Sequence, residues 1–359
     1  MLASPTVTHR ITLIPGDGIG PEVVAAARAV VEATGVPVTW NVQEAGAGVM
    51  DAEGTPLPDR VLHAIRESRT ALKGPITTPV GTGFRSVNVA LRQDLDLFAA
   101  VRPSRRLPGV PSRHPHVDVV VIRENTEDLY QGVEFERGSK ELARLRAELQ
   151  QVRGYRIPAD AGVTLKPISV TGTQRIVRFA LDFARRHGRT NVTVGHKANI
   201  MRFSDGVFLE TALEIDRQDY PDIDVEAVQI DELAMRLAAE PEMLNVLLLP
   251  NLYGDIISDL CAGLVGGLGL APGANLGWEY GLFEAVHGSA PDIAGKGVAN
   301  PIAMILSAAM MLRHLAATKE ADAIEAAVSG VLAQGNVRTP DMGGTAGTMD
   351  VAGAIVDAL

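Results

Sequence analysis

Residues 11–34 read ITLIPGDGIGPEVVAAARAVVEAT and contain, in order, a strand pattern, a turn and a helix pattern. The β-branched and aliphatic run at 11–14 predicts a strand, and the glycines of PGDGIG predict a tight turn after it. Pro21 suits the first turn of a helix, and Gly35 suits its end. This stretch therefore predicts a strand that turns at once into a helix, which is the repeating unit of an α/β protein.

The same alternation continues along the chain. Strand patterns occur at residues 117–122, 191–195, 225–230 and 246–249, and helix patterns at 172–187, 300–314 and 320–333. Strands that alternate with helices in this way predict an α/β fold. Between residues 125 and 165 the rhythm weakens, so we expect this segment to leave the main sheet.

The glycine turn resembles a dinucleotide-binding fingerprint but does not match it. The spacing is G-x-G-x-G-P, so Pro21 stands where the fingerprint needs its third glycine. No acidic residue follows at the distance that the ribose contact requires. We interpret the glycines as a tight strand-to-helix turn, and we expect any dinucleotide to bind at another loop.

Composition excludes several classes of protein. At 359 residues the chain exceeds the usual size of a single hydrophobic core, so two domains are expected. Cys261 is the only cysteine, which excludes an intrachain disulfide and a cysteine-based zinc site. A net charge of −10 argues against a nucleic-acid partner. The N-terminus lacks the apolar core of a signal peptide, and the longest apolar stretch, residues 301–312, is too short for a membrane span, so we expect a cytosolic enzyme without a membrane partner.

Arginines are concentrated between residues 85 and 123, where seven arginines stand against three aspartates. Arg123 directly follows the strand at 117–122, a position where α/β proteins often place ligand contacts. Arg92, Arg102 and Arg123 together favour a site for a polycarboxylate, because each guanidinium can pair with one carboxylate through two hydrogen bonds. Ser86 and Asn88 add neutral polar groups. A surface salt bridge explains any one of these arginines equally well.

The segment from residue 204 to residue 259 is acidic, with fourteen Asp or Glu against two Arg. Asp255 and Asp259 are four residues apart, so on a helix their carboxylates share one face. They repel each other unless a cation lies between them, and oxygen ligands of this kind suit Mg²⁺ or Mn²⁺. Asp231, after the strand at 225–230, is a candidate third ligand. Helix capping by Asp255 is the alternative, but it accounts for only one of the two residues.

Lys197 and Tyr130 are the candidate proton-transfer residues. Lys197 follows the strand at 191–195, and a lysine beside a metal and several arginines suits a general base, with Tyr130 as the acid partner. A surface lysine is the alternative. His287 begins a glycine- and proline-rich loop at 287–300, where small residues allow a ligand close to the backbone. A purely structural histidine is the alternative there.

Eight blocks of the sequence, in this order, resemble those of the isocitrate/isopropylmalate dehydrogenase family of β-decarboxylating dehydrogenases. They are IPGDGIGPEV, KGPITTPVG, NVALRQDLDL, VIRENTEDLYQG, GHKANIMRFSDG, NLYGDIISDL, GGLGLAPGANLG and AVHGSAPDIAGK. The resemblance covers nearly the whole chain and implies the fold of that family, which is not a Rossmann fold. It implies a large domain of residues 1–98 and 266–359, and a small domain of residues 99–265 with the dimer interface. A clasp segment at about 128–168 is implied to interlock two subunits.

The resemblance also assigns roles. Arg92, Arg102 and Arg123 correspond to the carboxylate-binding arginines, Tyr130 and Lys197 to the catalytic pair, and Asp255, Asp259 and Asp231 to the metal ligands. Lys197 and Asp231 are implied to serve the neighbouring subunit, so each active site requires a homodimer, and a higher oligomer remains open. The implied cofactor contacts are His287, Gly288, Ala290, Pro291, Asp292, Ile293, Asn300 and Asp341.

Two short stretches indicate substrate and cofactor within the family. Ser86 and Asn88 stand where isopropylmalate enzymes present apolar residues, and they suit the third carboxylate of isocitrate. Asp292 and Ile293 stand where NADP enzymes carry lysine and tyrosine, and a carboxylate repels a 2′-phosphate, which favours NAD. The expected reaction is NAD-dependent, metal-assisted oxidative decarboxylation of isocitrate to 2-oxoglutarate. The alternatives are a homoisocitrate, 3-isopropylmalate or tartrate dehydrogenase of the family, or a non-catalytic regulatory subunit.

Overall fold

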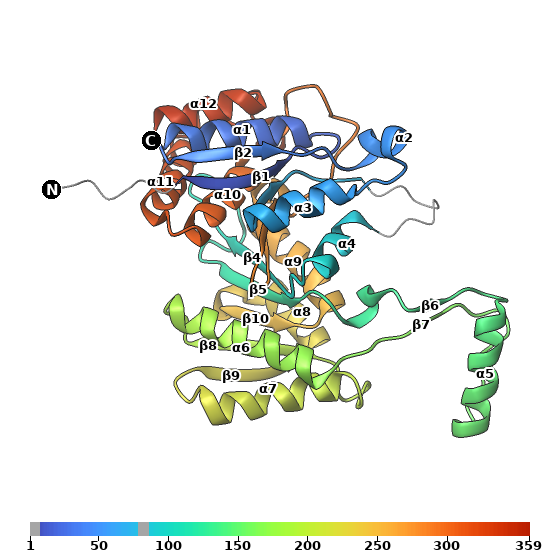
Figure 1. Cartoon of the computed structure of the whole chain (residues 1–359). Coiled ribbons are helices and arrows are strands. Elements are labelled where there is room, and N and C mark those ends of the chain that lie inside the picture. Colours follow the sequence, from blue (N-terminus) through green and yellow to red (C-terminus); the bar gives the residue numbers. More distant parts are fainter. Residues whose placement is uncertain (1–7, 78–85) are drawn as a thin grey trace.

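The computed structural model describes residues 8–77 and 86–359, and this part of the chain folds around one ten-stranded sheet. The strands lie in the order β2-β1-β3-β12-β11-β4-β5-β10-β8-β9. Helices cover both faces of the sheet, and one arm projects from the body (Figure 1). The predicted α/β fold class is confirmed.

Two parallel blocks that run in opposite directions make up most of the sheet. The first block contains β1 (His9–Ile14), β2 (Val38–Val42), β3 (Thr70–Lys73) and β12 (Gly281–Ala285). The second contains β5 (Asp118–Glu124), β8 (Asn191–His196), β9 (Asp224–Gln229) and β10 (Val246–Leu249). Between them lie β4 (Ala99–Arg105) and β11 (Pro272–Leu276), whose antiparallel pairings reverse the direction. This mixed order confirms that the fold is not a Rossmann fold.

Different helices cover the two faces. One face, here called the α10 face, carries α1 (Gly20–Ala33), α6 (Val170–Arg186), α7 (Asp205–Asp219), α10 (Ile302–His314), α11 (Thr318–Gln334) and α12 (Thr348–Asp357). The other, the α9 face, carries α3 (Asp59–Ser68), α4 (Val87–Asp94), α8 (Ile230–Ala239) and α9 (Asn251–Leu264). The short helix α2 (Met50–Glu53) lies after β2.

Strand alternation decides which side chains reach the α9 face. Residues paired across six neighbouring strands are all buried in the core on the α10 face: Leu72, Phe283, Ala274, Val101, Ile122 and Leu248. Because successive side chains of a strand point to opposite faces, the next residues along β3, β12, β4 and β5 point to the α9 face. Those residues are Lys73, Glu284, Arg102 and Arg123. The sheet thus presents four charged side chains on one face.

The glycine turn between β1 and α1 is confirmed as a tight turn. Gly18 has a φ of +61°, and a Cβ added there would lie 1.9 Å from the backbone oxygen of Ser289. The next residue, Ile19, donates its N–H to that same oxygen at 2.9 Å. The turn therefore supports the loop at 287–300 by direct backbone contact.

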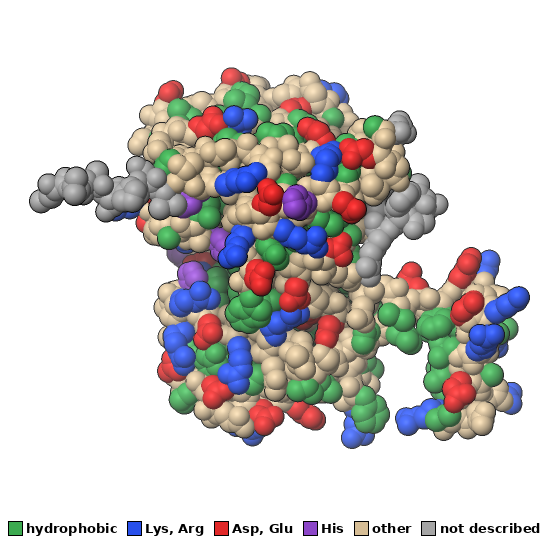
Figure 2. Space-filling view, in the orientation of Figure 1, with side chains coloured by type: hydrophobic (Ala, Val, Ile, Leu, Met, Phe, Trp, Pro, Cys, Tyr) green, Lys and Arg blue, Asp and Glu red, His purple; other side chains and the backbone are tan. Residues whose placement is uncertain are grey.

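An arm formed by β6 (Glu134–Phe135), α5 (Lys140–Arg153) and β7 (Val163–Thr164) occupies the segment expected to leave the sheet. Helix α5 was not expected, because its sequence shows charge but little apolar periodicity. It begins at Ser139, whose hydroxyl accepts a hydrogen bond from the N–H of Leu142 at 3.1 Å. Figure 2 shows the arm standing clear of the body with hydrophobic side chains on it. Val152 and Tyr155 are 64% and 66% exposed, so the arm presents apolar surface.

The end of β9 differs from the expected strand boundary. We expected Asp231 to follow a strand ending at residue 230, but β9 ends at Gln229 and Asp231 lies in the first turn of α8. The domain boundaries stay a prediction, because one continuous sheet crosses both proposed domains. Among the described helices, none has the length and hydropathy needed to cross a membrane.

Candidate active site

A cavity of about 300 Å³ on the α9 face collects side chains from the first parallel block, from β4 and from α9. The sequence-predicted residues that line it are Ser86, Asn88, Arg92, Arg102, Tyr130, Asp255, Asp259, His287 and Gly288. Arg123 lies beside it and contacts Asp255, whereas Lys197 and Asp231 are not among the lining residues. The structure therefore brings together the predicted arginines, the tyrosine and two of the three predicted metal ligands.

Arg123 is buried at the end of β5 and is held by α9. Its Nε and Nη2 donate to the side-chain oxygen of Asn251 at 3.0 and 2.7 Å, and its Nη1 donates to Asp255. Burial first, and then the charge of Arg92, lower the pKa of Arg123 to about 10, so it stays charged at neutral pH. Its donors are directed at the protein, so Arg123 acts on the cavity mainly through Asp255.

Arg92 and Arg102 differ from Arg123 because they keep unused donors. Their side chains are only 11% and 6% exposed. The buried Nε of Arg92, Nη1 of Arg102 and Oδ1 of Asn88 have no hydrogen-bond partner in the described part of the chain. Buried polar atoms are rarely left without a partner, so these three indicate a polar ligand in the cavity.

Asp255 and Asp259 lie one turn apart on α9, as expected, and both line the cavity. The residue that caps α9 is Pro250, so the capping role considered for Asp255 is excluded. Partial burial, and then the charge of Asp255, raise the pKa of Asp259, which reflects the repulsion of two adjacent carboxylates. Two such carboxylates suit a hard divalent cation. Across the described residues, no group of three or more His, Cys, Asp or Glu side chains is placed to hold a metal ion, and the third predicted ligand, Asp231, does not line the cavity.

Tyr130 lies in the 3₁₀ turn Asp128–Gln131 and donates its hydroxyl to Asp255. The Arg123 guanidinium lies 4.8 Å from the centre of its ring. Burial, and then the hydrogen bond to Asp255, raise the pKa of Tyr130 and keep the phenol protonated. A protonated phenol on the cavity wall is suited to act as an acid.

Lys197 and Asp231 form a separate pair, in which the Lys197 ammonium bonds to the Asp231 carboxylate and, at 3.2 Å, to the Gln229 side chain. Asp231 is 68% exposed at the side chain, so the pair lies at the surface. The carboxylate of Asp205 accepts the backbone N–H of Lys197 at 2.7 Å and fixes the turn after β8. Both residues are thus ordered but available to a second chain.

The predicted cofactor loop is anchored at both ends. The N–H of Gly295 donates to Glu22 of α1, and the hydroxyls of Ser289 and Thr77 lie 2.7 Å apart. Asn300 donates to Asp341 at 3.0 Å, so these two predicted contacts are adjacent. Of the other predicted contacts, His287 and Gly288 line the cavity, and Ala290, Pro291, Asp292 and Ile293 follow them in the loop. Burial lowers the pKa of His287, and its Nε2 has no partner in the described structure.

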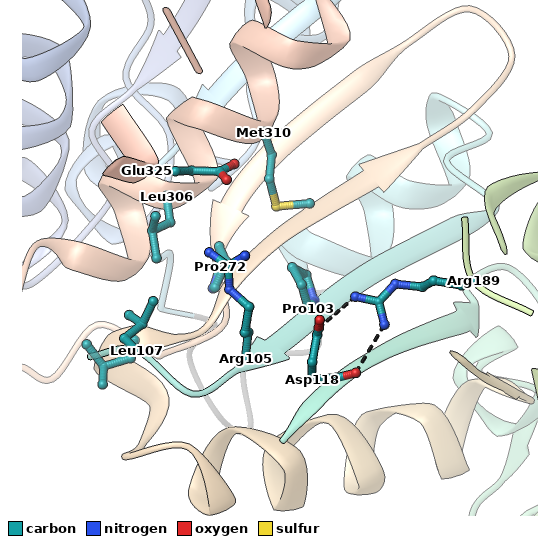
Figure 3. Close-up of a pocket in the computed structure, with 10 residues that line it drawn as sticks. Pro103, Arg105, Leu107, Asp118, Arg189, Pro272, Leu306, Met310 and Glu325 are labelled. Carbon is teal, nitrogen blue, oxygen red and sulfur yellow. Dashed lines mark hydrogen bonds and ion pairs between the residues drawn. The ribbon is translucent and has the colours of Figure 1, made fainter. Parts of the chain in front are cut away.

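A second cavity, of about 150 Å³, lies on the opposite α10 face (Figure 3). Pro103 and Arg105 of β4 form its floor with Met310 of α10 above them. Arg189 and Asp118 pair across one side at 2.6 Å. None of the predicted site residues lines this cavity, whereas nine of them line the cavity on the α9 face.

Lys73 and Glu284 line the active-site cavity and were not among the predicted site residues. Lys73 ends the short strand TALK, Glu284 is the penultimate residue of GLFEA, and both side chains are almost fully buried. A charged residue inside such a run is a usable signal, because buried charges require partners. The sequence alone does not reveal that the two strands are neighbours.

A family model described as isocitrate/isopropylmalate dehydrogenase matches residues 10–355. The crystal structure of isocitrate dehydrogenase from Methylococcus capsulatus is 48% identical, with a TM-score of 0.89, and the match covers 98% of this chain and 99% of that one.

Curated relatives carry several activities in their names. The NAD isocitrate dehydrogenase catalytic subunit 5 of Arabidopsis thaliana is 44% identical, over 99% of this chain and 90% of its own length. The NADP isocitrate dehydrogenase of Thermus thermophilus is 45% identical, over 93% of this chain and 64% of its own length. Other relatives are named as a regulatory subunit and as a 3-isopropylmalate dehydrogenase.

The expectation of a cytosolic enzyme is contradicted. The relatives named as NAD isocitrate dehydrogenase subunits, from Arabidopsis thaliana, Dictyostelium discoideum and other organisms, are named mitochondrial. The expectation rested on a missing signal-peptide core and a missing membrane span. A protein of the mitochondrial interior, like one of the cytosol, needs neither a secretory signal peptide nor a membrane span, so neither observation separates the two compartments.

Proposed function

The chain belongs to the isocitrate/isopropylmalate dehydrogenase family, and on that basis we propose that it is an NAD-dependent isocitrate dehydrogenase acting by oxidative decarboxylation. The observation that carries the proposal is one cavity lined by Arg92 and Arg102, each of which has an unused donor, and by the carboxylates of Asp255 and Asp259. Guanidiniums bind the substrate carboxylates, and a divalent cation on the aspartates neutralises the acidic wall. Ser86, which directly precedes α4, and Asn88 on α4 line the same cavity, where their polar groups suit a third carboxylate.

The residues of the chain then divide the steps of the reaction between them. Arg92, Arg102 and, through Asp255, Arg123 bind and orient the substrate. When bound, Mg²⁺ or Mn²⁺ polarises the substrate oxygen and NAD accepts the hydride. Lys197 removes the proton from the substrate hydroxyl, and Tyr130 returns a proton to the carbon that has lost CO₂.

Completion of the site requires a second copy of the chain. Lys197 and Asp231 lie outside the cavity of their own chain, and we assign them to the site of the partner in a homodimer. Large apolar side chains are exposed beside them: Met235 on α8 and Ile256 on α9 are 60% and 59% exposed. Such exposure favours a protein interface, and the arm is the proposed clasp across it.

The choice of NAD rests on Asp292 and Ile293 in the loop at 287–300. Asp292 is exposed, so its carboxylate is free to accept hydrogen bonds from ribose hydroxyls and to repel a 2′-phosphate. The test is a steady-state comparison of NAD⁺ with NADP⁺ on isocitrate in the presence of Mg²⁺ or Mn²⁺. We expect NAD⁺ to give the higher kcat/KM.

The same assay separates the alternatives. Turnover of homoisocitrate, 3-isopropylmalate or tartrate in preference to isocitrate would replace the proposed substrate. NADP⁺ preference would overturn the interpretation of Asp292. No turnover by the purified chain, with isocitrate still bound, would favour a regulatory subunit.

A further inference from the structure

Glu284 is a buried carboxylate in contact with three cations. Its side chain is 7% exposed, and its Oε2 lies 2.7 Å from the Nζ of Lys73. Its Oε1 lies 3.6 Å from Nη2 of Arg92 and 3.6 Å from Nη2 of Arg102. The one acid thus joins side chains from β3, α4 and β4.

The strands around Glu284 are shaped for this contact. Lys73 and Glu284 are paired residues of the parallel strands β3 and β12. A Cβ added at Gly273 would lie 2.0 Å from Nη1 of Arg102, so the glycine on β11 leaves the space through which that guanidinium reaches the acid. The side chain of Asn275, also on β11, donates to Oε1 at 2.8 Å and fixes the carboxylate. Burial alone would raise the pKa of Glu284, but Lys73, Arg102 and Arg92 outweigh it and hold the pKa well below its usual range.

The distances from Glu284 to Arg92 and Arg102 indicate how its carboxylate acts on the two guanidiniums. At 3.6 Å each of these two contacts is an ion pair longer than an ordinary hydrogen bond, so Glu284 attracts both guanidiniums chiefly through its charge. Burial first, and to a lesser extent the charge of Arg92, lower the pKa of Arg102, since the two guanidiniums repel each other. A shared counter-charge offsets this repulsion and allows both guanidiniums to stay side by side on the cavity wall.

We propose that Glu284 is a positioning residue, whose carboxylate holds Arg92 and Arg102 side by side so that both reach the same polycarboxylate. The inference rests on the proposed function, because it takes isocitrate as that polycarboxylate. Glu284 acts through the arginines and needs no contact with the substrate.

The test is Glu284→Gln, which keeps the shape and removes the charge. A glutamine that left the arginines in place would take a negative charge away from a trianion and would tighten isocitrate binding. If the arginines lose their positions, the effect is opposite: we expect isocitrate to bind more weakly by at least about tenfold and KM for NAD⁺ to change less. Calorimetric titration of isocitrate with Mn²⁺, without NAD⁺, measures the first quantity, and steady-state kinetics measure the second.

Matched variants separate charge from shape. Glu284→Asp keeps the charge and is expected to stay within a few-fold of the wild type. Glu325→Gln changes an acid that lines the cavity on the α10 face (Figure 3) and pairs with Arg313 at 2.6 Å, and it is expected to bind isocitrate as the wild type does. Equal weakening in Glu284→Asp and Glu284→Gln, or weakening of KM for NAD⁺ alone, would contradict the proposal.

The remaining outcomes are also decisive. The Glu284→Gln protein leaves Lys73 unpaired and could fail to fold for that reason. In that case Lys73→Met is compared with the double variant Lys73→Met/Glu284→Gln. The double variant is expected to bind isocitrate more weakly than Lys73→Met by at least about tenfold. If the wild type binds isocitrate and Glu284→Gln binds it equally or more tightly, only the positioning role fails. If the wild type binds no isocitrate, the proposed function fails and the inference fails with it.

Discussion

Asp255 is the residue at which the basic and acidic parts of the site meet. It accepts hydrogen bonds from Arg123 and Tyr130, and it faces Asp259 one turn along α9. In the proposed mechanism, its carboxylate orients the acid catalyst and also serves as a ligand for the cation. A single substitution there affects both tasks.

Replacement of Asp255 by Asn is expected to abolish metal-dependent turnover. The amide is a much weaker ligand than a carboxylate for a divalent cation, so we expect Mn²⁺ affinity and kcat/KM each to fall by at least about a hundredfold. The measurement is Mn²⁺ titration beside the isocitrate assay. Asp222→Asn is the control, because Asp222 pairs with Arg185 on the surface and is expected to leave both quantities unchanged. Full activity with bound metal in Asp255→Asn would contradict the assignment.

Among the secondary-structure elements, the turn from β1 to α1 has a role that its glycine spacing does not reveal. The spacing excluded a dinucleotide fingerprint, and the turn instead supports the loop expected to bind the dinucleotide. That support is steric, because the backbone oxygen of Ser289 occupies the space that a side chain at Gly18 would need.

Replacement of Gly18 by Ala is expected to raise KM for NAD⁺ by about tenfold or more, with a smaller change in KM for isocitrate. The Cβ collides with Ser289 and displaces the loop, in addition to the roughly 1–2 kcal/mol cost of a left-handed alanine. Gly35→Ala is the matched control, because Gly35 also has a positive φ, of +77°, but no neighbour within 4 Å. It is expected to lower thermal stability by the backbone cost alone and to keep both KM values. Identical kinetics in the two variants would refute a role of Gly18 in loop support.

Sequence patterns predicted the elements that have a clear period and missed those that depend on distant neighbours. The spacing of Asp255 and Asp259 correctly predicted a shared helix face, and the apolar run before Arg123 correctly predicted a strand that ends in the site. Helix α5 was missed, because an arm that projects from the body needs no apolar stripe facing a core of its own chain. Lys73 and Glu284 were missed, because their pairing follows from β12 joining β3 across more than two hundred residues of chain.

At the scale of the whole molecule, the site lies where the direction of the sheet reverses. β3 and β12 bring Lys73 and Glu284 from the first block, and β5 and α9 bring Arg123, Asp255 and Asp259 from the second. Open α/β sheets bind ligands where strand order or direction changes, since side chains from both sides converge there. Lys197 and Asp231, which the proposed mechanism also requires, lie outside the cavity of their own chain.

A shared site makes a prediction that no single-chain site makes. Lys197→Met removes the proposed base from the partner's site, and Tyr130→Phe removes the acid from the chain's own site, so each pure variant is expected to be nearly inactive. When the two are unfolded together and refolded in equal amounts, half of the dimers contain one chain of each kind, and each such dimer has one site with both residues intact. Activity is therefore expected to return to about a quarter of the wild-type value.

The control mixture is Tyr130→Phe with Asp255→Asn. Both changes lie in the chain's own site, so every site in that mixture keeps one defect and no recovery is expected. Recovery in the control mixture, or none in the first, would show that Lys197 serves its own chain.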